Sequence, residues 1–157
     1  MRRLVLCTVL LSGCGGDETP WVGTWRYLGL KCENAAPDFF VKGAFQAKLE
    51  LGEKLGTTIL TDDGCTVRQE DYLITPVDGG KFEFPTSTSK RVVCNPDPCE
   101  LKQTVTELGK TTEQVFKCPA DFPPQGNLPP GEVESDGILR VRLNDAAKCV
   151  LQYAKEG

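Results

Sequence analysis

Short runs of alternating apolar and polar residues constrain this chain more than any other feature of its sequence. In 44–51 the apolar residues, Phe45 and Leu49 among them, alternate with polar ones, and 138–143 repeats the pattern. Alternation with a period of two is typical of a half-buried strand. Turn signals separate such runs, and no helical period is present. The pattern predicts about eight to ten strands, within the runs 21–27, 44–51, 57–61, 65–74, 81–84, 90–94, 100–108, 111–118, 138–143 and 149–154.

Many short strands joined by tight turns predict an all-β fold. We expect a small antiparallel up-and-down barrel, because sequential hairpins favour closure and closure removes the exposed sheet edges that promote aggregation. A chain of 157 residues is long enough for one such domain. The segment 119–131 carries five prolines and two glycines, so we expect a long surface loop there.

Eight cysteines are present, and two of them, Cys7 and Cys14, lie near the N-terminus. An even number of the remainder in an exported chain predicts three disulfides, whose pairing the spacing leaves open. Closeness in sequence favours a bond between Cys94 and Cys99 across the turn between them. A zinc site is a weaker alternative, because no C-x-x-C pair occurs. The six disulfide candidates are Cys32, Cys65, Cys94, Cys99, Cys118 and Cys149.

The first thirteen residues have the organisation of an export signal. Arg2 and Arg3 precede an apolar run at 4–11, and the small residues Ser12 and Gly13 follow it. The run is too short to cross a bilayer, which takes about 20 apolar residues in a helix. The sequence therefore predicts a signal peptide at 1–13 and no transmembrane helix there.

The four residues Leu11-Ser12-Gly13-Cys14 at the end of this run resemble the lipobox of bacterial lipoproteins. The resemblance implies that the Cys14 thiol takes a diacylglyceryl group, that the chain is cut before Cys14, and that the new amine is acylated, for example by palmitate. Two or more acyl chains anchor a protein stably, since each buried CH₂ contributes about 0.8 kcal/mol.

A lipidated Cys14 would make the envelope membrane the first partner of this protein. Residues 14–20 would be the anchor and its tether. Gly15 in place of an Asp after the lipidated cysteine favours the outer membrane within the same resemblance. The alternative is a secreted protein in which Cys14 enters a disulfide.

The charge balance and the lack of histidine narrow the function further. The chain has a net charge of −4, and loss of Arg2 and Arg3 would leave 16 basic residues against 22 acidic ones. Such a balance argues against nucleic-acid binding. The sequence has no histidine, the commonest general base and a common metal ligand, and no nucleophile motif. We expect a protein that is not an enzyme and that needs no cofactor or metal.

The run Gly23-Thr24-Trp25 resembles the Gly-x-Trp motif that opens the first strand of lipocalins and related calycins. The resemblance implies that Gly23 gives the backbone room at the closed end of a barrel and that Trp25 plugs this end. It also implies a basic side chain across the Trp25 ring, a cation–π contact. Arg140, Arg142 and Lys155 are the candidates. The alternative is that Trp21 and Trp25 are core aromatics of another β fold.

These features together predict an envelope lipoprotein with one β-barrel domain at 21–157 and a non-enzymatic binding role. A small barrel can carry an apolar ligand, although the same side chains could equally fill a solid core. The alternatives are an envelope protease or lysozyme inhibitor that acts through loops, or a structural or adhesion lipoprotein of the surface. The candidates for the barrel lining are Phe45, Leu49, Phe82, Phe84, Leu139 and Val141.

Overall fold

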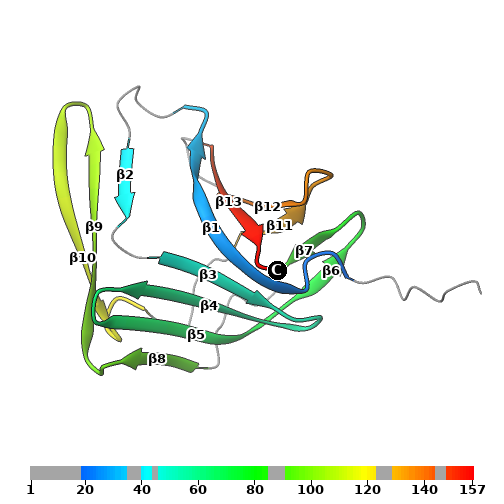
Figure 1. The fold of residues 1–157 in the computed structure, drawn as a ribbon, viewed down its shortest axis with the longest axis horizontal. Coiled ribbons are helices and arrows are strands. Elements are labelled where there is room, and N and C mark those ends of the chain that lie inside the picture. The colour runs from blue at the N-terminus through cyan, green and yellow to red at the C-terminus, as the bar shows by residue number, and fades with distance from the viewer. Residues whose placement is uncertain (1–18, 35–39, 44–45, 85–90, 123–128, 144–147) are drawn as a thin grey trace, which may run out of the picture.

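The computed structural model of the protein describes residues 19–34, 40–43, 46–84, 91–122, 129–143 and 148–157, with the side chains of 40–43 excepted. These residues form strands and no helix (Figure 1), so the predicted all-β class is confirmed. The strands are β1 Gly23–Cys32, β2 Phe40–Gly43, β3 Gln46–Leu51, β4 Leu55–Asp62, β5 Cys65–Leu73, β6 Thr75–Val77, β7 Lys81–Glu83, β8 Arg91–Asn95, β9 Cys99–Glu107, β10 Lys110–Cys118, β11 Gly131–Val133, β12 Ile138–Arg142 and β13 Cys149–Lys155.

Every run that the alternation marks forms a strand, with shifted ends. The strands that it does not mark are β2, β6 and β11, which have 4, 3 and 3 residues. Strands of this length are too short to show a period of their own. The expected loop at 119–131 has no strand in its described part except at Gly131, the first residue of β11, and its residues 123–128 lie outside the described ranges.

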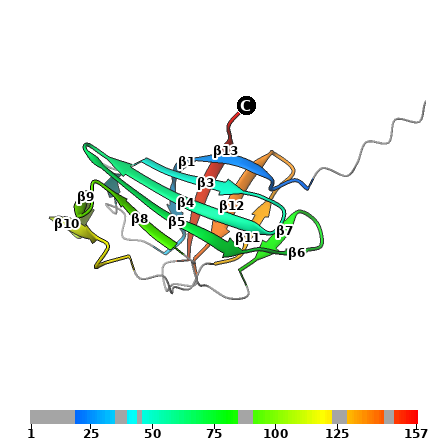
Figure 2. The ribbon, with the colours of Figure 1, turned by 90° about the horizontal axis from the view of Figure 1, so that it is seen from below.

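Ten strands form one antiparallel sheet in the order β6-β7-β11-β12-β13-β1-β3-β4-β5-β8. At the middle of this order β13, the last strand, pairs with β1, the first, and the sheet curls round on either side of them (Figure 2). β6, at one end of the sheet, begins two residues after Leu73, where β5 finishes, and β5 lies next to β8 at the other end. Around the sheet the strands follow chain order except that β2, β9 and β10 leave it and β8 lies beside β5, ahead of β6 and β7. The result is the barrel-like body that the sequence predicts (Figure 2).

The remaining strands form a second sheet in the order β10-β9-β2. β9 and β10 are a regular hairpin, paired without a register shift from Glu107↔Lys110 at the turn to Cys99↔Cys118 at the base. We call residues 99–118 the arm. In Figure 1 the arm stands at one side of the barrel-like body, with β10 outermost and β2 on its inner side.

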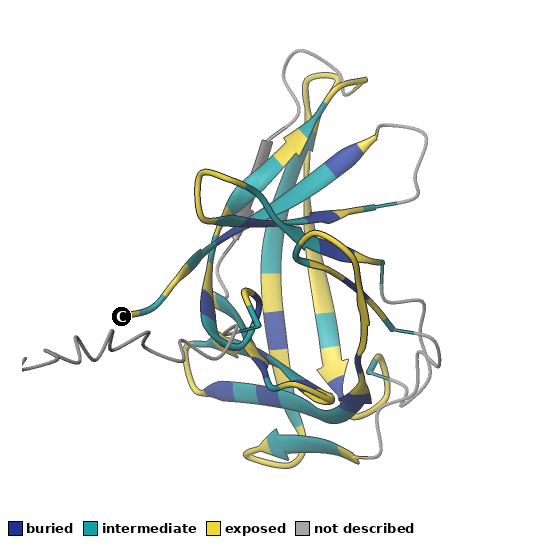
Figure 3. Cartoon of the chain, turned by 90° about the vertical axis from the view of Figure 1, so that its right-hand side faces the viewer, coloured by how far each residue is buried: buried dark blue, intermediate teal, exposed yellow. Residues whose placement is uncertain are grey.

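The interior of the barrel-like body is filled by large side chains. Trp25, Phe82 and Leu139 are at most 1% exposed, and they belong to a cluster with Ile74 and Tyr153 among others. Burial raises the pKa of the Tyr153 phenol above its usual range, so this group stays neutral. Buried segments are spread over several strands (Figure 3), as expected when alternate residues of a curved sheet face inward.

A second and smaller cluster lies where the arm meets the body. It contains Cys65 and Val67 from β5, Leu101 from β9 and Cys118 from β10, all at most 3% exposed. The base of the arm is therefore buried against β5, whereas its outer part is not.

The structure contains three disulfides, as predicted. The prediction that Cys94 bonds to Cys99 is wrong. The pairs are Cys32–Cys149, Cys65–Cys99 and Cys94–Cys118. Cys94 lies in β8 opposite Val67 of the large sheet, whereas Cys99 lies in β9 opposite Cys118 of the small one. The two cysteines beside the turn thus enter different sheets, and each bonds across to the other sheet.

A glycine opposite an aromatic ring fixes the packing of β7 against β11. Gly131 pairs with Phe82, and a β carbon on Gly131 would lie 2.8 and 2.9 Å from the two ε carbons of the Phe82 ring. The Phe82 side chain is fully buried, so its ring can shift only if its neighbours shift too. We expect Gly131→Ala to lower the free energy of unfolding by about 1–3 kcal/mol, the usual cost of overpacking, measured by denaturant titration with the disulfides intact.

Gly29 provides the matched control, because a β carbon there would meet nothing within 4 Å and its φ is not positive. Gly29→Ala should leave the free energy of unfolding unchanged or raise it slightly, since alanine loses less backbone freedom on folding. Equal losses for both variants would show that the Phe82 contact does not limit residue 131.

Candidate functional site

Gly23, Trp25 and Lys155 lie together where β1 and β13 pair. Trp25 is 1% exposed and donates its indole N–H to the carbonyl of Trp21 at 2.7 Å. Lys155 lies opposite Trp25 in the register, and its Nζ is 5.8 Å from the centroid of the Trp25 ring, within cation–π range. A β carbon on Gly23 would lie 2.7 Å from Lys155 Cε, and the φ of Gly23 is +140°. Glycine at 23 therefore leaves room for the lysine chain on its way to the ring.

The two other candidate cations at this position have different partners. Arg140 binds Asp136 at 2.7 Å and Glu134 at 3.0 Å, and Arg142 binds Glu134 at 2.9 Å. The hydrogen bond from Arg140 lowers the pKa of Asp136 to about 2. Of the three basic side chains considered, the structure places Lys155 over Trp25.

The described candidates for a barrel lining pack together in the core. Phe82, Leu139 and Val141 are buried members of the large cluster, and Leu49 and Phe84 are partly buried against it. Phe84 meets Phe82 edge to face at 5.5 Å. Phe45, the sixth candidate, lies outside the described residues, as does Cys14. Those five side chains fill the interior with contacts to one another.

A pocket of about 260 Å³ lies on the outer side of β7, β11 and β12. Its charged lining residues, such as Lys81, Glu132 and Arg140, alternate along their strands with residues of the buried core. Small-molecule sites are usually about 300–1,000 Å³ and mainly apolar. Here Arg140 and Arg142 are held by carboxylates, and Lys81 lies 3.7 Å from Glu132. The pocket has the character of a surface depression crossed by ion pairs.

The arm presents an exposed and mainly polar surface. All six residues at the start of β10, 110–115, are exposed. Hydrogen bonds between side chains cross the hairpin, from Gln103 to Gln114 at 2.6 Å and between Thr106 and Thr111 at 3.1 Å. Leu108 at the turn is 75% exposed. The arm is a stiff polar ribbon that offers backbone, hydroxyl and amide groups to a partner.

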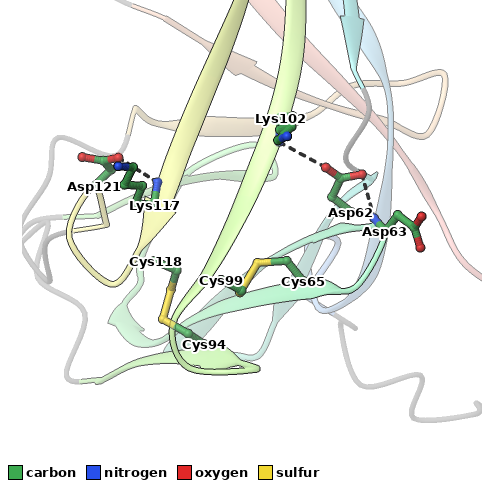
Figure 4. The surroundings of a disulfide bond; sticks show 9 residues. All are labelled: Asp62, Asp63, Cys65, Cys94, Cys99, Lys102, Lys117, Cys118 and Asp121. Carbon is green, nitrogen blue, oxygen red and sulfur yellow. Dashed lines mark hydrogen bonds between the residues drawn. A yellow bond between two sulfur atoms is a disulfide. The ribbon is translucent and has the colours of Figure 1, made fainter.

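Two disulfides brace the base of the arm (Figure 4). Cys99 and Cys118 are opposite each other in the hairpin, and each is bonded to a cysteine of the body. Side chains support the same region: Asp62 accepts a hydrogen bond from the Lys102 amide at 3.1 Å, and Asp121 accepts one from the Lys117 amide at 2.7 Å. Both strands of the arm are thereby fixed at the base, and the outer part projects from a rigid support.

Sequence reasoning did not identify the arm as an exposed hairpin, although a signal was present. Residues 102–114 contain only two large apolar residues, Val105 and Leu108, in a stretch that is otherwise polar on both faces. A strand whose faces are both polar has no core to cover, so it must be exposed on both sides. Half-buried strands, such as β3, alternate instead.

Two further features of the described residues bear on chemistry and location. No group of three or more Cys, Asp or Glu side chains there could hold a metal ion. Within the same ranges no helix has the length and apolar character needed to cross a membrane.

The fold and its exposed arm define a class: a disulfide-braced, barrel-like β protein with a projecting hairpin and a filled interior. Comparisons with family models, with curated proteins and with solved structures find no match to this chain.

The brace at the base of the arm can be tested by removing one of its bonds. We expect Cys94→Ser with Cys118→Ser to lower stability by about 2–5 kcal/mol and to free β10 at its base. Trypsin should then cut at Lys102, Lys110 or Lys117 much faster than in the native protein, which mass spectrometry of the fragments would show.

Removal of the Cys32–Cys149 bond is the matched control, because that disulfide joins paired residues of β1 and β13 within the body. The double serine variant there should lose stability without faster cleavage in the arm. Equal cleavage of the arm in both variants would mean that the disulfide at its base does not hold it.

Proposed function

We propose that this chain is a lipid-anchored protein of the bacterial envelope with a non-enzymatic binding role, and that the arm is its binding surface. The observation that carries the proposal is the arm itself, a long exposed hairpin fixed at its base by two disulfides. Binding is favoured when the binding surface is ordered beforehand, because less freedom is lost on association. The brace at 99 and 118 provides that order.

The packing of the body favours a surface partner over a ligand carried inside. Phe82 and Leu139, proposed from the sequence as lining residues, are fully buried against other core side chains. A solid interior serves as a rigid scaffold for exposed elements, the arrangement in which envelope inhibitors and adhesion proteins act. We therefore place an envelope protein, rather than an apolar small molecule, first among partners.

The proposed relation to lipocalins and calycins rests on the base of the body. Gly23, Trp25 and Lys155 have the arrangement that the Gly-x-Trp motif implies, with glycine leaving room and a cation over the buried ring. Three residues support a kinship in scaffold, and a scaffold is compatible with many functions. The binding role is argued from the arm alone.

The location can be tested at Cys14. In a bacterium that processes lipoproteins, we expect the mature chain to begin at Cys14, to carry diacylglyceryl and acyl groups, and to need detergent for release from membranes. Cys14→Ser should remain uncleaved and unacylated. Mass spectrometry of the N-terminal peptide measures both, and an unmodified or disulfide-bonded Cys14 in the native protein would contradict the anchor.

The binding surface can be tested by photo-crosslinking in intact cells. A photoreactive amino acid in place of Glu107, exposed next to the turn of the arm, should form an adduct with one envelope protein of defined mass. Glu53 is the matched control, since it is an exposed glutamate in another hairpin turn. Adducts of equal yield at both positions, or none at Glu107, would exclude the arm as the binding surface.

A further inference from the structure

The outer edge of β10 is the longest open strand edge in the described chain. The four edge strands of the two sheets are β6, β8, β2 and β10, with 3, 5, 4 and 9 residues. Natural proteins keep edge strands short or protect them, because an open edge is a template for another strand. β10 is the exception among these four.

The hairpin geometry determines which backbone groups of β10 point outward. Leu108 and Gly109 have positive φ angles of 50° and 71° and form a two-residue turn, so Glu107 and Lys110 are a hydrogen-bonded pair. Pairs alternate from there, and the odd residues of β10 direct N–H and C=O away from β9. Lys117 fits this alternation, because its N–H and C=O both bind Asp121, at 2.7 Å each.

The other open positions of the arm are covered. Asp121 caps the outer edge at Lys117, and on the inner edge of the arm Asp62 binds the amide of Lys102 while β2 pairs with residues 103–106. The stretch 111–115 of β10 has no strand or cap beside it among the described residues. It also lacks two of the usual protections, since β10 contains no proline and pairs with β9 without a bulge, and Glu113 is the one charged residue within this stretch.

We propose that this edge pairs with the same edge of a second copy of the chain, antiparallel and centred on Thr112. Two strands of identical sequence can pair in this way only in registers that are self-complementary. The centre at Thr112 places Thr111 opposite Glu113 of the second copy and Lys110 opposite Gln114. No like charges face each other, and threonine pairs stabilise antiparallel strands.

Neighbouring registers are worse for identifiable reasons. A centre at Glu113 sets two carboxylates opposite each other, which destabilises strand pairing. A centre at Gln114 requires the N–H and C=O of Lys117, which Asp121 already occupies. A centre at Thr111 moves the pairing toward the turn and limits it to residues 110–112 of β10, whereas the Thr112 centre pairs residues 110–114. The Thr112 register joins the two small sheets into one continuous sheet with β10 strands at its middle.

This inference goes beyond the proposed function, because self-pairing needs no other protein. A disulfide trap tests it in cells that express the full chain. Paired residues whose side chains do not flank hydrogen bonds lie about 4.5 Å apart at Cα, within disulfide range. Thr112→Cys should therefore give a disulfide-linked dimer on mild oxidation, with the three native disulfides intact by peptide mapping.

Two controls make the result specific for the edge and the register. Thr111→Cys, one residue away, should give at least tenfold less dimer, because residue 111 faces residue 113 of the other copy. Glu113→Pro added to Thr112→Cys removes an outward N–H without touching the bonds to β9, and it should lower the dimer yield at least tenfold. Glu113→Gln, which keeps the N–H, should leave the yield unchanged.

Absence of the Thr112→Cys dimer, an equal yield from Thr111→Cys, or insensitivity to Glu113→Pro would each overturn the proposal. If Thr112→Cys gives no dimer but the photo-crosslink at residue 107 still captures an envelope protein, the pairing is overturned and the proposed function stands. If the dimer forms but residue 107 gives no adduct, the pairing stands and the proposed binding surface is overturned. A crosslink from Thr112→Cys to a different protein would assign the edge to another chain and likewise overturn the pairing.

Discussion

Two disulfides that cross between the two sheets are the bonds on which the arm depends. Cys65–Cys99 and Cys94–Cys118 link β5 and β8 of the body to the two strands at the base of the arm. A two-stranded hairpin is marginally stable in water by itself. Most of the arm buries little apolar surface beyond Leu101 and the cluster around it. Disulfide bonds therefore stabilise the base of the arm, whereas hydrophobic burial stabilises the rest of the fold.

The body is stabilised in a different way. Trp25, Phe82 and Leu139 are buried among other large side chains, and burial of each such residue contributes about 1.5–3 kcal/mol. Pairing of the last strand with the first brings Lys155 over Trp25 and joins Cys32 to Cys149. The hydrophobic core thus fixes a rigid body, and the body supports an arm that has almost no core. This division explains why one polypeptide contains both strongly alternating strands and a hairpin that is polar on both faces.

Local patterns in the sequence predicted the strands well. They could not predict which distant strands pair with each other. The alternation in 44–51 or 138–143 is a property of neighbouring residues, so it can be recognised in the sequence. The Cys94–Cys99 bond was wrong because its two cysteines, close in sequence, belong to strands of different sheets. β2 and β11 were missed because these short segments are strands through their pairing with neighbouring strands, and their own residues show no alternation. Lys155 could not be chosen over Arg140 until the β1–β13 register was known.

The proposed anchor and the proposed pairing of the arm have a physical connection. A pairing along 110–114 is short beside the roughly 20–30 residues a side of a stable interface, so free copies in solution would associate weakly. Lipid on Cys14 would confine the copies to one membrane, and confinement raises the effective concentration of each copy for the next without any new contact. An open edge on an untethered protein is mainly a risk of aggregation. On a tethered protein, with Asp121 capping one end of the edge and the turn ending the other, the same edge can join two arms and then stop.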